Sequence, residues 1–185
     1  PAAVTSFEYG ITLRIHKVDE NGNYLPGAKL AAIDLDPEDV MQYMPTLEEL
    51  NNNFSYYDDW TSTDTYQDVY ATIIFETDIM QSEMMHDIWY IYEYEAPEGY
   101  KVSEPVLVKT SDIDIFKDYN GLISRNEFRE KIASGEIPDD GEYIYDVYVV
   151  NEKIKDTYQA NLTNKLDSIN ISITKIWEDE DDKYY

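Results

Sequence analysis

Alternating apolar and polar residues near the start of the chain predict a β-strand. Between residues 11 and 16 every second residue is Ile or Leu, and the residues between them are polar or charged. A period of two is typical of a strand that buries one face. The same alternation places Lys17 on the apolar face. The acidic, amide and glycine residues at 19–23 then predict a turn, and 24–30 a second strand.

Comparable apolar segments predict further strands and place more polar residues on buried faces. The predicted strands cover 69–76, 88–95, 105–109, 143–151 and 158–164. Glu93 shares a strand face with Trp89 and Ile91, because these residues alternate. Asn151 and Asn164 lie on the apolar sides of the last two predicted strands. Many short strands joined by turns predict an all-β fold of the sandwich type.

Two segments between the strands have a helical pattern. Apolar residues at loosely helical spacing follow Pro37 in 36–54 and predict a helical excursion. A second, short helix is predicted at 126–134, where Gly135 ends it.

The pattern at the start of the chain recurs near its end. At 169–175 three isoleucines at alternate positions precede Lys175, as the apolar residues at 11–15 precede Lys17, and an acidic segment follows in both places. We interpret this as an internal repeat. It divides the chain into one β-domain at 1–165 and, at 166–185, the first strand of a following, truncated domain.

The composition excludes several classes of function. The formal net charge is −25, from 39 acidic and 14 basic residues, so phosphate backbones and anionic lipid surfaces are repelled. We therefore expect neither nucleic acid binding nor membrane insertion. With no cysteine, disulfides and thiolate chemistry are excluded. No apolar run reaches the roughly 18 residues of a spanning helix, and no signal pattern opens the chain, so we expect an excised mature segment.

Three polar side chains on apolar strand faces require an explanation. An unpaired buried charge costs roughly several kcal/mol, and an unsatisfied buried amide about 1–3 kcal/mol. Lys17, Glu93 and a strand asparagine could satisfy one another. Burial disfavours the charged forms of amines and carboxyl groups, so such a pair can exist as a neutral amine beside a carboxylic acid. This places a nucleophile next to an acid.

The motifs around these residues resemble a known family. The segment I-T-L-R-I-H-K-V-D-E-N-G contains Lys17, L-P-G-A follows it, and Y-I-Y-E-Y-E-A-P-E-G-Y contains Glu93. Together they are similar to the Cna-B, or SpaA-type (prealbumin-like), domains of Gram-positive surface adhesins and pilins. The end of the chain, L-T-N-K-L before I-S-I-T-K-I-W-E-D-E-D-D, resembles the junction between two such domains. The segments 36–68 and 111–140 depart from the family pattern as insertions.

The resemblance implies a Greek-key, immunoglobulin-like β-sandwich closed by a Lys–Asn isopeptide bond. Lys17 would be the nucleophile, and Glu93 would polarise the carboxamide and transfer protons while ammonia leaves. Asn164, just before the next domain, is the predicted partner, and Asn151 is the alternative. By the same analogy Lys175 belongs to the following domain and stays unreacted here. The reaction occurs once per molecule, so we expect no enzyme. A hydrolase using Glu93 and Glu95 is disfavoured, because the chain has only two histidines, His16 and His86, and no glycine-rich phosphate loop.

A weaker pattern suggests calcium. Asp118, Asn120, Ser124 and Glu127 match most positions of a calcium loop, but its first position is Phe116, which cannot coordinate a cation. An acidic turn that caps the helix at 126–134 is the alternative, and the sequence favours it. No cofactor is required by the isopeptide chemistry.

Two functions follow from these expectations. The first is a structural and adhesive stalk module of an extracellular, cell-wall-anchored or pilus protein, with neighbouring domains of the same protein as its partners. The second is a ligand-binding adhesin head, in which the tyrosine-rich, acidic insertions bind a host protein or glycan. Exposed aromatic residues clustered on the insertions would favour the head, and buried or scattered ones the stalk.

Overall fold

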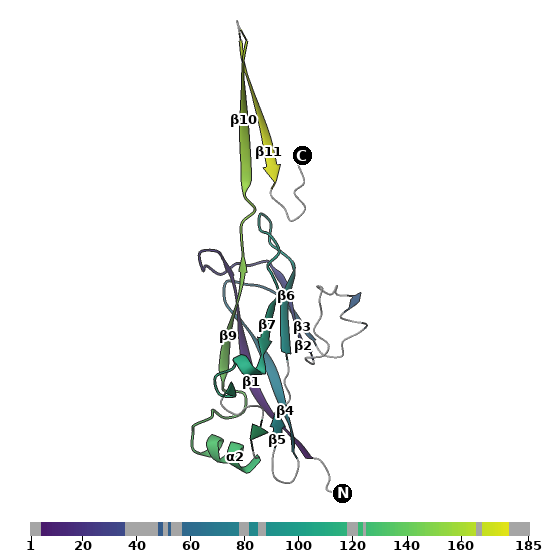
Figure 1. The fold of residues 1–185 in the computed structure, drawn as a ribbon, viewed down its shortest axis with the longest axis vertical. Helices are drawn as coiled ribbons and strands as arrows, with labels where there is room; N and C mark the ends of the chain where they lie inside the picture. The colour runs from purple at the N-terminus through teal and green to yellow at the C-terminus, as the bar shows by residue number, and fades with distance from the viewer. Residues whose placement is uncertain are drawn as a thin grey trace.

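Two large β-sheets and one small one make up the described part of the chain (Figure 1). The computed structural model describes residues 5–35, 48–49, 52, 57–77, 82–84, 88–117, 122–123, 125–165 and 168–177. The first sheet has five strands, in the order β8 (Leu122–Ile123), β5 (Ser82–Met84), β4 (Gln67–Thr77), β1 (Thr5–Asp19) and β9 (Ile144–Asn151). The second has four, in the order β3 (Tyr57–Thr61), β2 (Lys29–Leu35), β6 (Ile88–Glu95) and β7 (Val106–Lys109).

Strand β1 lies between β4, from the middle of the chain, and β9, the last strand of the sheet in sequence order. It is antiparallel to β4, from Thr5 opposite Thr77 to Ile15 opposite Gln67. It is parallel to β9, with Thr12 opposite Ile144 and Lys17 opposite Val149. The first and last strands of the two large sheets therefore lie side by side and run in the same direction. β1 begins well before the alternation that predicted it, at Thr5 and not at Ile11, because the residues from Thr5 onward also have partners in β4.

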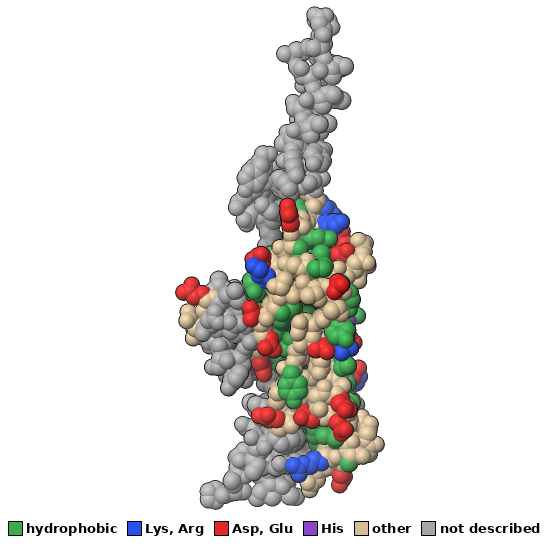
Figure 2. All heavy atoms as spheres, turned by 180° about the vertical axis from the view of Figure 1, so that it is seen from behind, with side chains coloured by type: hydrophobic (Ala, Val, Ile, Leu, Met, Phe, Trp, Pro, Cys, Tyr) green, Lys and Arg blue, Asp and Glu red, His purple; other side chains and the backbone are tan. Residues whose placement is uncertain are grey.

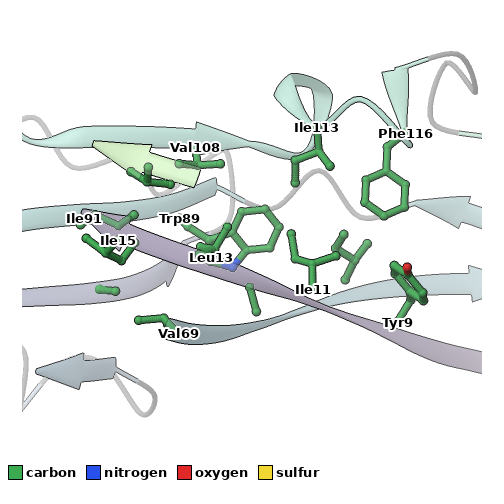
Figure 3. Packing of buried hydrophobic residues seen from close by; sticks show 14 of the residues in the cluster. Tyr9, Ile11, Leu13, Ile15, Val69, Trp89, Ile91, Val108, Ile113 and Phe116 are labelled. Atoms are coloured by element: carbon green, nitrogen blue, oxygen red, sulfur yellow. The ribbon is translucent and has the colours of Figure 1, made fainter. Parts of the chain in front are cut away.

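The core lies between the two large sheets, which confirms the prediction of a mainly β protein with the layered arrangement of a sandwich. Figure 3 shows the apolar side chains of β1 packed against those of the second sheet. The buried residues from β1 include Ile11, Leu13 and Ile15, and the facing sheet contributes Trp89 and Ile91. The alternation in 11–15 thus corresponds to a buried strand face, as predicted.

The two segments that were predicted to be insertions contain both helix and strand. Helix α2 (Arg125–Ala133) agrees with the predicted 126–134 to within one residue at each end, and a short 3-10 helix covers Thr110–Asp112. The segment 36–68 also contains β3, which pairs with β2 and was not predicted, because Y-D-D-W-T has no apolar alternation. Of the predicted helical excursion at 36–54, residues 48, 49 and 52 are helical and the rest lie outside the described residues.

The C-terminal strands form a sheet of their own. β10 (Asp156–Lys165) pairs antiparallel with β11 (Ser168–Trp177), from Asp156 opposite Trp177 to Lys165 opposite Ser168. The predicted boundary at 165 falls between β10 and β11, two strands that pair with each other along their whole length. Assignment of 166–185 to a following domain stays a prediction.

Truncating the β1 core face should destabilise the protein. Leu13 is fully buried, so Leu13→Ala should lower the free energy of unfolding by about 2–5 kcal/mol through lost burial and the cavity left behind. Val150 on β9 is 46% exposed, and Val150→Ala should change it by less than about 1 kcal/mol. Urea titrations of both variants measure the difference, and equal effects would contradict the assigned core.

Candidate functional site

Lys17 lies near the end of β1 with its side chain inside the sandwich. Only 2% of its surface is exposed. A lysine is almost never buried unless it has polar partners. Its Nζ donates a hydrogen bond to the carbonyl oxygen of Val149, 3.2 Å away on the neighbouring strand. The alternation of β1, which puts Lys17 in register with the core residues before it, forces this burial.

Asn151 is the last residue of β9 and lies on the same face of the sheet as Lys17. Lys17 is opposite Val149, and Asn151 is two residues further along, so the two side chains are diagonal neighbours. Asn151 is fully buried. Its Nδ2 donates to Glu93 Oε2 at 2.7 Å and to the backbone carbonyl oxygen of Lys101 at 2.6 Å.

Glu93 reaches this pair from β6 of the opposite sheet. It is fully buried, and its two carboxyl oxygens face different partners. Oε1 lies 3.5 Å from Lys17 Nζ. Oε2 accepts hydrogen bonds from Asn151 Nδ2 and from the backbone N–H of Ser103, each at 2.7 Å. The structure therefore brings Lys17, Glu93 and Asn151 together between the sheets.

The segment after β6 completes the site with backbone groups. After Gly99, whose φ of 86° is in the left-handed region that favours glycine, the chain runs beside the residues that follow β9. Lys101 N–H donates to the carbonyl of Glu152, and Ile154 N–H to that of Gly99, both at 2.9 Å. These bonds hold Lys101 and Ser103 in place beside the asparagine and the glutamate.

Burial makes the lysine a better nucleophile. Desolvation lowers the pKa of Lys17, and the nearby Glu93 carboxyl partly opposes this shift. A lower pKa increases the fraction of neutral amine, the form that can attack a carbonyl carbon.

The contact between Lys17 and Glu93 is looser than that of a tight ion pair. The 3.5 Å between Nζ and Oε1 exceeds the roughly 2.7–2.9 Å typical of a charge-assisted hydrogen bond. Within the described part of the chain, Glu93 Oε1 and Asn151 Oδ1 are buried with no hydrogen-bond partner. Unsatisfied buried atoms of this kind cost about 1–3 kcal/mol each and are typical of functional sites.

Asn164, the partner expected from the sequence, lies elsewhere. It is on β10, opposite Ile169 of β11, in the separate two-stranded sheet. Its side chain is outside the described residues. The signal in favour of Asn151 was the apolar face that it ends, but the parallel pairing of β9 with β1 could not be derived from that face alone.

The calcium loop predicted from the sequence lies mostly outside the described residues. Asp118, Asn120 and Ser124 lie outside the described residues, and Glu127 is exposed in the first turn of α2. Among the residues that are described, no three acidic or histidine side chains form a group able to hold a metal. Phe116, at the first loop position, is buried in the core, with its ring centroid 6.0 Å from that of Tyr9.

Exposed tyrosines gather on the outer face of the first sheet. His16 of β1 stacks on Tyr148 of β9, with ring centroids 4.6 Å apart, and also contacts the rings of Tyr24 and Tyr66. Of these three tyrosines only Tyr66 belongs to a predicted insertion. Acidic side chains are scattered over the face drawn in Figure 2.

No helix within the described ranges is long and apolar enough to span a membrane.

The chain is similar in structure to several solved pilins. Neither a protein-family model nor a curated protein sequence matches the chain. The full-length major pilin SpaD from Corynebacterium diphtheriae matches 91% of the chain at 17% identity, with a TM-score of 0.36. The shaft pilin SpaA from Lactobacillus rhamnosus GG matches 90% at 10% identity, with a TM-score of 0.40. A streptococcal ancillary pilin matches 90% at 11% identity, with a TM-score of 0.36. The chain spans 36%, 59% and 47% of these three proteins, respectively.

Proposed function

We propose that the chain is a structural module of a Gram-positive surface or pilus protein, stiffened by an isopeptide bond between Lys17 and Asn151. The observation that carries the proposal is the buried cluster of an amine, a carboxyl and a carboxamide, with Glu93 between the two residues to be joined. Neighbouring domains of the same cell-wall-anchored protein would be its partners.

The bond would form by direct attack of the amine on the amide. The neutral Nζ of Lys17 adds to Cγ of Asn151, the Cγ–Nδ2 bond breaks, and ammonia leaves. Nζ gives up one proton and Nδ2 gains one, so the reaction needs no oxidant, water or cofactor. Glu93 is suited to transfer this proton, because Oε1 faces Nζ and Oε2 is hydrogen-bonded to Nδ2.

The position and burial of the reacting groups favour this step kinetically. The reacting groups are held by neighbouring strands, which replaces a bimolecular encounter with an intramolecular one. The site is closed to solvent, so water is excluded as a competing nucleophile. The product contains no free nucleophile or leaving group, so each molecule reacts once.

The place of the bond fits a load-bearing role. Because β1 and β9 are parallel, a pull on the N-terminal end of β1 and the C-terminal end of β9 shears the two strands past each other. A bond from Lys17 to Asn151 would carry this load directly between them. Residues 18–150 would then carry no load. The part of β1 that does carry load is already an extended strand, so it could lengthen little under tension.

The intact mass of the denatured protein tests the bond. The wild type should be lighter than its calculated mass by one ammonia, about 17 Da, because Nδ2 is lost. Lys17→Ala and Glu93→Ala should each have their full calculated mass, since one lacks the nucleophile and the other the proton-transfer group. Peptide mapping of the wild type should find Lys17 joined to Asn151.

A surface ion pair offers the matched control. Lys29 Nζ lies 2.7 Å from Glu95 Oε2, but this pair is exposed to solvent. Lys29→Ala should therefore still lose about 17 Da, like the wild type. A full calculated mass for the wild type would refute the crosslink, and mapping to Asn164 would refute the choice of asparagine.

Pulling single molecules by their two ends tests the load path. Lys17→Ala should release a chain length on the order of 400 Å when the sandwich unfolds, since residues 18–150 become extensible. The wild type should show no such step, because the crosslink keeps that segment out of the path. A step of equal length in both proteins would contradict the role.

A further inference from the structure

Both hydrogens of the Asn151 amide group are bound by acceptors that the fold supplies. One N–H is directed to Glu93 Oε2 at 2.7 Å, and the other to the carbonyl oxygen of Lys101 at 2.6 Å. A carboxamide nitrogen carries two hydrogens, so its donor capacity is filled. The carboxamide oxygen Oδ1 has no partner within the described residues.

The Lys101 carbonyl is an acceptor that cannot change its role. A backbone carbonyl has no hydrogen to donate at any pH, whereas a carboxyl group can accept or donate. Its position is set by the backbone bonds from Lys101 N–H to Glu152 and from Ile154 N–H to Gly99. The group in contact with it must therefore be a donor.

A carboxyl group at position 151 would not fit these two acceptors. An ionised aspartate has only acceptor oxygens, so it would bring oxygen against oxygen at both contacts. A protonated aspartic acid has one O–H, which could satisfy one acceptor, but against an ionised Glu93 the second contact would still bring oxygen against oxygen. Leaving a buried acceptor unmatched costs about 1–3 kcal/mol.

We infer that the Lys101 carbonyl, together with Glu93 Oε2, makes this site selective for a carboxamide over a carboxyl group. This inference rests on the proposed crosslink and defines its chemistry: ammonia, and not water, is the group that leaves. Lys101 acts here through its backbone as a positioning residue. It holds Nδ2 against the carboxyl oxygen that delivers the proton, and its carbonyl takes no part in the bond changes.

Substitution of the asparagine by aspartate tests the selectivity. Asn151→Asp should keep its full calculated mass after prolonged incubation of the folded protein, while the wild type loses about 17 Da. Loss of about 18 Da from Asn151→Asp, the mass of one water, would overturn the inference. Asn126→Asp, at an exposed position on α2, is the matched control and should lose 17 Da like the wild type.

The outcomes distinguish the selectivity for a carboxamide from the proposed Lys17–Asn151 crosslink on which it rests. Full mass for the wild type would refute the crosslink itself and the selectivity with it. The loss of 18 Da by Asn151→Asp beside a crosslinked wild type would refute the selectivity alone.

A second measurement covers the case in which Asn151→Asp does not fold. In Lys17→Ala, which cannot crosslink, both Nδ2 protons of Asn151 should exchange with solvent far more slowly than those of the exposed Asn21. Exchange of either Asn151 proton at the rate of Asn21 would overturn the inference.

Discussion

The parallel pairing of β1 with β9 is the constraint on which the rest of the structure depends. It joins strands that are far apart in the sequence, and its register puts Lys17 opposite Val149, two residues from Asn151. A shift of one residue would turn one of the two side chains to the outer face. The apolar residues of β1 prevent such a shift, because they would leave the core along with Lys17. The packing of the core and the geometry of the polar cluster are therefore determined together.

The polar cluster has an energetic cost that the core must offset. A lysine and a glutamate are removed from water without a tight ion pair, and two of the buried oxygens have no hydrogen-bond partner in the described structure. The apolar core between the two large sheets supplies the compensating burial of apolar surface. Lys17 and Glu93 form a poor ion pair, but together with Asn151 they are well placed for the proposed reaction, which converts the amine and the carboxamide into an uncharged amide bond.

Local patterns predicted most of the described strands, although not β3, β5 or β8, and two of the three polar residues at the site. Alternation identified the buried face of β1 and put Lys17 on it, and the same rule placed Glu93 beside Trp89 and Ile91. The family resemblance then favoured Asn164 over Asn151. The structure places Asn151 beside Lys17 because of a long-range parallel pairing, which depends on tertiary packing and leaves no trace in the local pattern. The Lys101 carbonyl could not have been predicted, since a backbone group has no sequence signature.

The position of the insertions has an evolutionary consequence. Both segments predicted to be insertions, 36–68 and 111–140, lie between Lys17 and Asn151 in the sequence. In the crosslinked module, a change in the length of either segment would leave the distance between the domain's two points of attachment unaltered. Variation in the length of these segments would then be decoupled from the distance over which the proposed crosslink carries load.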